Sequence, residues 1–324
     1  MKLTLLLLLV FVLDGVLGDP RTMWHPVALF GRCASGMEQV ARRWWGNSVR
    51  AGCYAWCILC FGACAVAYLL VWLASLWGQC AEFLMAGILL YFTVALRSLC
   101  EHAENVRGPL ENGDLPAARS ALSMMVSRDT QSLGESDIVR GAVESLGENL
   151  VDGVASAYLW MVIGYVLGGL TGAVIAGFLL RAANTLDACW GYQDSRYRKF
   201  GRWAARADDF MQWLPARVTM PCIALAAAFG GGSFKETWHC AWRYRHAHPS
   251  PNSCWGMAAF AGALRISLGG PTSYNGVVEH YPRWGNGRRV LVAKDIQRAK
   301  QLAIISTICL LLALEILNFF CWLV

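Results

Sequence analysis

Long apolar runs separated by polar segments dominate the pattern of this chain. The runs lie at about 3–17, 53–77, 82–96, 157–180, 218–229 and 302–324. Those at 53–77 and 302–324 are long enough to cross a hydrocarbon core of ~30 Å, which needs about 20 residues. Those at 3–17 and 82–96 are shorter and would cross where the bilayer thins or neighbouring residues join them. The polar segments are compatible with helix and show little period-two alternation, so we predict an all-α, polytopic membrane protein with long loops.

The distribution of positive charge predicts how the chain crosses the membrane. Apart from Lys2, the Lys and Arg residues fall within 18–52, 97–156, 181–217 and 235–301. Because cytoplasmic loops are enriched in Lys and Arg, we expect all four segments on the cytoplasmic side. Six crossings would place 181–217 outside. We therefore predict that 157–180 turns back at Gly168–Gly169 as a helical hairpin and that 218–229 is a buried core helix. Four crossings remain, with both termini outside.

Composition agrees with membrane insertion. Of 324 residues, 56% are hydrophobic and only 15% are charged, and the formal net charge is +6. This is too apolar for an ordinary soluble domain, and the modest charge gives no argument for nucleic acid. Thirteen cysteines without a paired framework predict a reducing compartment. Cys53, Cys57, Cys60 and Cys64 share a helical face, where thiols at a helix–helix contact are favoured over a metal or iron–sulfur site. No linker or repeat divides the chain, so we predict one domain over 1–324.

The segment 140–153 carries the most informative polar pattern. On a helix, Arg140, Glu144, Glu148 and Asp152 recur every four residues and share one stripe. Three carboxylates at this spacing repel one another unless a cation lies among them, and the run contains no Lys. A divalent metal that carries a phosphate is the favoured candidate. The alternative is a solvated polar helix face.

Two further clusters lie near the starts of polar segments. Gly and Pro in 18–27 predict a turn that presents Asp19, Arg21 and His25 together. The alternative is a turn at the membrane surface with Arg21 against lipid phosphate. At 127–130, Arg128 could hold a phosphate and Asp129 a metal, although Asp-Thr is also an ordinary helix cap.

The remaining clusters lie in the second half of the chain. The first pairs acids and arginines, namely Asn184, Asp187, Arg206, Asp208, Asp209 and Arg217. It is either a metal and phosphate site or a solvated amphipathic loop. The second runs from His248 and Asn252 to Gly269–Gly270, where many Gly and Pro residues predict a loop that brings backbone close to a ligand. No phosphate loop, dinucleotide fingerprint, kinase signature or hydrolase elbow occurs, so any nucleotide pocket would be unusual.

These clusters, in this order between apolar helices, resemble the CobD/CbiB family of cobalamin biosynthesis. The resembling motifs are GDPR…HPV at 18–27, SRDT at 127–130, VESLGENLVDG at 143–153, NTLD…GY…RY…FG at 184–201, ARADD…WLPAR at 205–217, HPSPN at 248–252, AGAL at 261–264 and LGGP at 268–271. The chain departs from the usual wording at Ser127, at Gly147–Leu150, at Gln212, and at Gly256 and Met257, where a Glu is often seen. The resemblance covers nearly the whole chain and retains the principal carboxylates and arginines.

The resemblance implies a multi-pass inner-membrane enzyme, adenosylcobinamide-phosphate synthase, with its active site facing the cytoplasm. It would join adenosylcobyric acid to aminopropanol or aminopropanol phosphate as an ATP-dependent ligase. Other membrane-bound cobalamin-assembly enzymes are further candidate partners, beside the lipid bilayer itself. Two rival hypotheses are a catalytically inactive relative that acts as a sensor and a transporter of corrinoids or anions. A transporter should carry charges near the membrane midplane, and the few candidates, Asp14, Glu82 and Glu315, could lie near helix ends.

Amide formation through an acyl phosphate suggests roles for these residues. We expect catalytic roles for His25, Asp129, Glu144, Glu148, Asp152 and His248, with His25 or His248 as the base. We expect Mg²⁺ at Glu144, Glu148, Asp152, Asp208 and Asp209. We expect ATP and the substrates at Asp19, Arg21, Arg128, Asn149, Asn184, Asp187, Arg206, Arg217, Asn252, Gly269 and Gly270.

Overall fold

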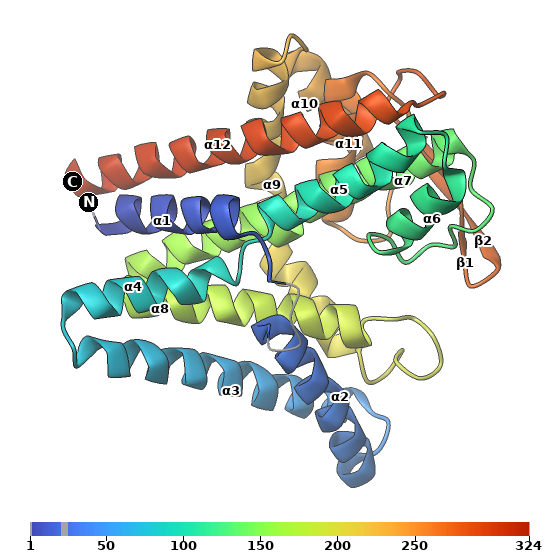
Figure 1. Ribbon diagram of the computed structural model, residues 1–324. Helices are drawn as coiled ribbons and strands as arrows, with labels where there is room; N and C mark the ends of the chain where they lie inside the picture. Colours follow the sequence, from blue (N-terminus) through green and yellow to red (C-terminus); the bar gives the residue numbers. More distant parts are fainter. Residues whose placement is uncertain (1, 21–24, 324) are drawn as a thin grey trace. The chain divides into compact units, whose positions relative to one another are not determined.

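Helices make up 75% of the chain and confirm the predicted all-α class (Figure 1). The computed structural model describes residues 2–20 and 25–323. In chain order the elements are α1 (Lys2–Leu17), α2 (Pro26–Trp45), α3 (Val49–Ser75), α4 (Gln79–Tyr91), α5 (Leu96–Glu111), α6 (Leu115–Ser123), α7 (Glu135–Leu150), a π-helical turn η1 (Val151–Ala155), α8 (Ser156–Trp190), α9 (Arg202–Phe229), α10 (Phe234–Tyr244), α11 (Ser253–Leu264), β1 (Leu268–Tyr274), β2 (Val277–Trp284) and α12 (Ala293–Leu323).

The chain divides into two compact units, each built from two stretches of sequence. Unit 1 comprises Met1–Ala95 and Ser156–Gln212, and unit 2 comprises Leu96–Ala155 and Trp213–Val324. The residues that were predicted to form sites are distributed over both units. The single domain over 1–324 stays a prediction.

Unit 1 is held together by small side chains between α2, α3 and α8. Its core contains Ala34, Ala41, Ala51, Ala55, Cys60, Ala182, Leu186, Trp190, Phe200 and Ala204. Cys60 is fully buried there, and the Cys64 thiol donates to the Ile175 carbonyl at 3.7 Å. The twelve cysteines from Cys33 to Cys309 are free thiols, and no metal-binding group of three or more His, Cys, Asp or Glu side chains occurs among the described residues. For Cys60 and Cys64, the predicted helix–helix contact is confirmed.

The predicted reversal within 157–180 is also confirmed. The backbone of α8 leaves the helical region at Gly168 (φ −157°, ψ 26°) and Gly169 (φ 61°, ψ −147°). A Cβ at Gly164 would lie 2.3 Å from the carbonyl oxygen of Gly172. A straight helix would keep residues eight apart separated by about 12 Å, so the two arms fold back on each other at these glycines. Only a residue without a Cβ permits this approach.

Within the described residues, four helical stretches are long and apolar enough to span a membrane. They are Val49–Ser75, Gln79–Glu111, Glu135–Trp190 and Ala293–Phe319. They include three of the runs predicted to cross, whereas α1 has only 16 residues and is not among them. The remaining stretch, Glu135–Trp190, contains the reversal at Gly168–Gly169. The run at 218–229 forms the end of α9, where Ile223 and Ala224 are fully buried, as expected of a core helix.

Unit 2 surrounds α7, which packs against α5, α11 and α12. Its one departure from the predicted class is the β1–β2 hairpin, which replaces the expected loop (Figure 1). Asn275 (φ 49°) and Gly276 (φ 78°) form its turn, and both positive φ angles suit a two-residue Asn-Gly hairpin connection. The prediction of a loop was wrong because the Gly and Pro residues of 268–271, which form a bulge at Gly269/Pro271, obscured the strand.

Candidate functional site

Glu144 and Arg140 of α7 hold the glycine-rich start of β1 by its backbone. The Glu144 carboxylate accepts the Gly269 N–H at 2.7 Å and pairs with Arg128 at 2.7 Å. Arg140 donates to the carbonyls of Gly269 and Pro271, the latter at 2.9 Å. Thus the cation beside the first acid of the stripe is in this structure a guanidinium from outside α7.

The backbone at Gly269 and Gly270 can be formed only by glycine. Their φ angles are 73° and 93°, in the left-handed region that L side chains avoid. A Cβ at Gly269 would also lie 2.3 Å from the Pro282 carbonyl oxygen. At Gly270 it would meet Arg140 Nη1 and the Arg283 guanidinium, each at 3.2 Å. The backbone here lies close to two arginine side chains, whereas its predicted approach to a ligand stays a prediction.

The segment 127–130 anchors the tip of the hairpin. The Asp129 carboxylate accepts the Ser273 hydroxyl at 2.6 Å and the N–H groups of Gly276 and Asn275 at 2.8 and 3.1 Å. These bonds, led by that of Ser273, hold the pKa of Asp129 below its usual value. Asp129 therefore acts in this structure as a cap for the hairpin turn.

Arg128 is nearly buried beside this cap. Burial lowers its pKa, but the charge of Glu144 and its ion pair with that residue outweigh burial, so that the net pKa is raised. Its Nη1 atom is buried and has no hydrogen-bond partner among the described residues. A guanidinium held on one side by Glu144 retains this donor for an anionic ligand.

Glu148 lies one turn beyond Glu144 and faces α11. It accepts the Ser253 hydroxyl at 2.7 Å. The close approach of α7 and α11 depends on Gly147 and Gly256, two of the positions at which the chain departs from the usual family motifs. A Cβ at Gly256 would lie 2.2 Å from the Gly147 carbonyl oxygen.

His248 lies at the edge of the same cluster, stacked on Tyr281 with ring centroids 5.3 Å apart. Burial lowers the pKa of His248, although the charges of Glu148 and Glu144 oppose the shift. Its Nδ1 accepts the Ser250 N–H at 3.2 Å, so the neutral ring carries its proton on Nε2. In this tautomer Nε2 is a hydrogen-bond donor, and the predicted role of His248 as a base stays a prediction.

Arg217 positions the loop that carries His248. It donates to the Asn252 side-chain oxygen and to the Trp213 carbonyl, both at 2.8 Å. Its guanidinium lies over the rings of Trp213 and Trp255, 4.6 and 5.0 Å from their centroids. Burial lowers the pKa of Arg217. A Lys ammonium would be a poor substitute here, because it lacks the planar guanidinium that lies over the two indole rings.

The last members of the predicted stripe lie differently from the α-helical expectation. Asn149 donates back to the Ser145 carbonyl and hydroxyl at 2.9 and 3.1 Å. Asp152 lies in the π-helical turn η1, which changes the register of side chains relative to α7. Glu144 already has Arg128 and Gly269 as partners. In the part of the chain that the structure describes, the three acids do not form a metal-binding group.

Unit 1 gathers the remaining predicted residues in two places. His25 Nε2 lies 2.8 Å from the Asp19 carboxylate, and Nδ1 accepts the Val27 N–H at 3.3 Å as the cap of α2. The predicted role of His25 as a base stays a prediction. Arg21 lies outside the described residues.

The second place in unit 1 lies between α8 and α9. Asp208 is buried, and burial, with the nearby charge of Asp187, raises its pKa to about 7 even though Asn184 donates a hydrogen bond to it. The charge of Asp209 adds to the increase. Arg206 is exposed on the same helix. Asp187, Asp208 and Asp209 thus influence one another, but the described residues include no metal-binding group of three acids, and the predicted metal and phosphate site stays a prediction.

A buried acid in α2 was missed by the sequence reasoning. Glu38 has only 4% of its surface exposed, and it accepts from Arg42 at 2.8 Å, Arg196 at 3.0 Å and the Tyr197 hydroxyl at 3.0 Å. The i,i+4 spacing of Glu38 and Arg42 was a weak signal for a local pair. Its long-range partners belong to the RY of the 184–201 motif.

Comparison with known proteins agrees with these motifs. Residues 7–303 match the model of the family described as CobD/Cbib protein. The chain is 35% identical over 297 residues to "Cobalamin biosynthesis protein CobD" of Leptospira interrogans, with 92% of each chain covered. Proteins of the same name from Chromobacterium violaceum (38% identity, 93% of this chain and 92% of the relative) and Clostridium perfringens (33%, 94% and 95%) are also similar. No solved structure matches this chain.

Proposed function

The chain belongs to the CobD/CbiB family of cobalamin-biosynthesis proteins, and within that family we propose that it is adenosylcobinamide-phosphate synthase. The proposed reaction joins a carboxyl group of adenosylcobyric acid to the amine of aminopropanol or aminopropanol phosphate. The observation that supports it best is the convergence of four motif segments of unit 2 around the Arg128–Glu144 pair. We place the enzyme in the inner membrane with this cluster facing the cytoplasm, because the Lys- and Arg-rich segments belong on that side.

The reaction needs activation, because a carboxylate is a poor acyl donor. We propose that the γ-phosphoryl group of ATP passes to a carboxylate oxygen of the corrinoid and ADP leaves. The amine nitrogen then forms a bond to the acyl carbon, and inorganic phosphate leaves as the C–O bond breaks. Phosphoryl transfer is catalysed mainly by positioning and by cations on the phosphate oxygens.

Residues of unit 2 suit these steps. Arg128 offers a buried donor to a phosphate oxygen. The neutral His248 ring offers Nε2–H to the oxygen that becomes negative when the amine attacks. Glu148, whose one carboxylate oxygen is held by Ser253, attracts the substrate ammonium and takes its proton. Arg217 positions the His248 loop through Asn252.

Mg²⁺ enters this proposal as the ion that accompanies the nucleotide. The described residues provide no preformed group of three ligands for it, and Glu144 is engaged by Arg128 and Gly269. No step is therefore assigned to a metal that the protein itself holds.

The reconstituted reaction tests this function. Purified protein in detergent, with adenosylcobyric acid, aminopropanol phosphate, ATP and Mg²⁺, should form adenosylcobinamide phosphate and ADP in equal amounts. Parallel reactions omit one component each. Product without ATP would overturn the activation step. Corrinoid binding without product under every condition would instead favour the sensor or the transporter.

A further inference from the structure

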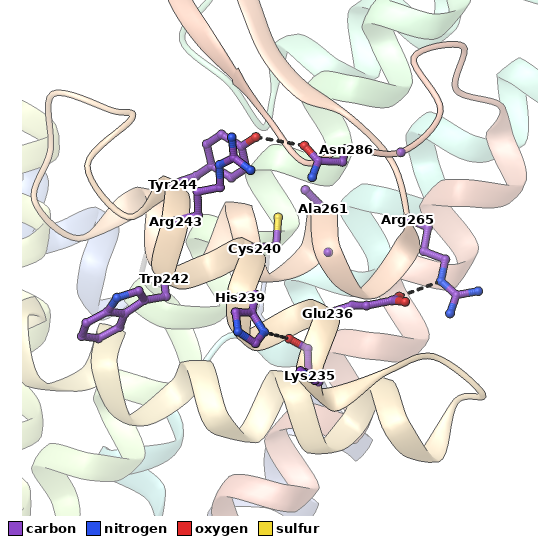
Figure 2. Close-up of a pocket in the computed structure, with 12 residues that line it drawn as sticks. Lys235, Glu236, His239, Cys240, Trp242, Arg243, Tyr244, Ala261, Arg265 and Asn286 are labelled. Atoms are coloured by element: carbon purple, nitrogen blue, oxygen red, sulfur yellow. Dashed lines mark hydrogen bonds and ion pairs between the residues drawn. The ribbon is translucent and has the colours of Figure 1, made fainter.

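We propose that a cavity between α10, α11 and the segment 286–287 binds a phosphate-bearing anion (Figure 2). The cavity has a volume of about 670 Å³, which is within the usual range for small-molecule sites. All of its lining residues belong to unit 2. None of them was assigned a role by the sequence analysis except Ala261 and Gly262, which belong to the AGAL motif.

The lining carries an excess of positive charge. Lys235, His239 and Arg243 recur every four residues along α10 and therefore share one face of that helix. Arg265 joins them from the end of α11, where it pairs with Glu236 at 3.0 Å. Lys235, Arg243 and Arg265 contribute three positive charges and Glu236 one negative charge, so the permanent net charge is +2.

Two of these cations have no carboxylate partner in the described chain. The ion pairs among the described residues of unit 2 include those of Arg128, Arg140 and Arg265, but none of them involves Lys235 or Arg243. Unneutralised cations around a cavity favour an anionic ligand, since bringing them together costs repulsion that such a ligand removes.

Asn286 and Tyr244 add polar groups at one wall. The Tyr244 hydroxyl donates to the Asn286 side-chain oxygen at 3.0 Å, which orients the side-chain amide so that its NH₂ group is left for other acceptors. Figure 2 shows Arg243 beside the Tyr244 ring on the same wall. Guanidinium, ammonium and amide donors around one space match the acceptor oxygens of a phosphate group.

The Arg265 end of this cavity is distant from the catalytic cluster, although the lining residue Trp242 packs against Trp255 of α11 with ring centroids 5.7 Å apart. Ser253 at the start of α11 contacts Glu148, whereas Arg265 just beyond the end of α11 lines the cavity. Twelve residues of helix separate them by about 18 Å. The proposal therefore stands whether or not the chain is the ligase.

The phosphate group could belong to a soluble ester or to a phospholipid. Phe234 and Trp238 are exposed on the arc of α10 next to the basic row, stacked with centroids 5.8 Å apart. Exposed aromatic side chains beside basic ones are typical of helices at a membrane surface. The ligand chemistry is the same in both cases, and the experiment separates the sources.

Binding is tested with two probes and one pair of variants. Full-length protein in detergent is dialysed against radiolabelled inorganic phosphate and AMP. The same protein in nanodiscs of phosphatidylcholine, with or without phosphatidylglycerol, is compared by its melting temperature. Lys235→Gln/Arg243→Gln removes both free cations. Arg245→Gln removes one charge at the residue that caps the end of α10 and serves as the control, because Arg245 contacts the lining residue Trp242 but does not itself line the cavity.

Loss of two charged hydrogen-bond donors should weaken phosphate or AMP binding roughly 100-fold or more, and Arg245→Gln should change it little. If the ligand is a lipid, phosphatidylglycerol should raise the melting temperature of the wild type and of Arg245→Gln but not of the double variant. The proposal would be overturned if the wild type neither bound phosphate or AMP nor gained melting temperature from phosphatidylglycerol. It would also be overturned if Arg245→Gln lost as much binding as the double variant.

Discussion

At the scale of single residues, Glu148 is more accessible to a substrate than Glu144. Glu144 is buried and held by Arg128 and Gly269, whereas Glu148 is half-buried and accepts a hydrogen bond from Ser253. The sequence predicted both acids by their spacing alone. It could not separate their roles, because the partners that distinguish them come from segments far away in the chain.

Glu148→Gln should therefore abolish most turnover while preserving the fold. The glutamine oxygen still accepts the Ser253 hydroxyl, but the charge that attracts the amine and the base that takes its proton are lost. General-base removal typically costs about 10²–10⁴-fold in rate. Product formation is measured against Ser253→Ala, which removes the hydrogen bond and leaves the carboxylate. Turnover close to the wild-type rate in Glu148→Gln would remove this residue from the reaction.

Asp208 predicts a pH dependence of stability in unit 1. Its folded pKa of about 7 lies above the ordinary value of 3.8, so the folded state binds the extra proton between these two values. Stability is therefore greatest at low pH and is lost as pH rises through this window. At pH 8, Asp208→Asn, which stays uncharged, should have a free energy of unfolding higher than that of the wild type by on the order of 1–4 kcal/mol, and therefore a higher melting temperature. The two proteins should converge near pH 4. A difference independent of pH would assign the effect to packing.

At the scale of elements, the arrangement of α7 and α11 depends on glycines that the sequence showed only as departures from a motif. Gly147 and Gly256 let the two helices approach closely, and this approach brings Ser253 to Glu148. The long apolar runs predicted the membrane helices, and Gly168–Gly169 predicted the reversal of α8. Contacts between backbones distant in sequence leave no such periodic signal, and the hairpin turn Asn275–Gly276 was overlooked beside the glycines of 268–271.

Gly256→Ala should destabilise this crossing and lower activity together. The new Cβ would lie 2.2 Å from the Gly147 carbonyl oxygen, and backbone on both sides leaves little room to yield. Overpacking of this kind typically costs about 1–3 kcal/mol. Gly62→Ala in α3 is the matched control, because a Cβ there meets nothing within 4 Å. Melting temperature and product formation should both fall for Gly256→Ala and remain unchanged for Gly62→Ala. Equal behaviour of the two variants would show that the crossing is loosely packed.

At the scale of the whole molecule, the basic segments and the lengths of the apolar runs together predict the membrane topology. The basic segments are separated by runs of unequal length, and only a reversal within 157–180 keeps 181–217 on the same side as the rest. The break in α8 provides that reversal. Long-range contacts show how each unit is held together, whereas the side of the membrane on which a loop lies follows from the positive charges.

Thiol labelling in intact cells tests this topology. If the basic segments are cytoplasmic, single cysteines at Ser195→Cys and Val277→Cys should resist a membrane-impermeant reagent until the cells are opened, because both positions are exposed to solvent on the protein surface. The four-crossing arrangement places the short turn between α3 and α4 outside. Cys80, an exposed native thiol at the start of α4, should therefore be labelled in intact cells and serves as the positive control. All other cysteines are replaced, so that each protein carries one thiol. Labelling at Ser195→Cys alone would mean that α8 crosses the membrane without returning. The predicted cytoplasmic position of 181–217 would then be wrong.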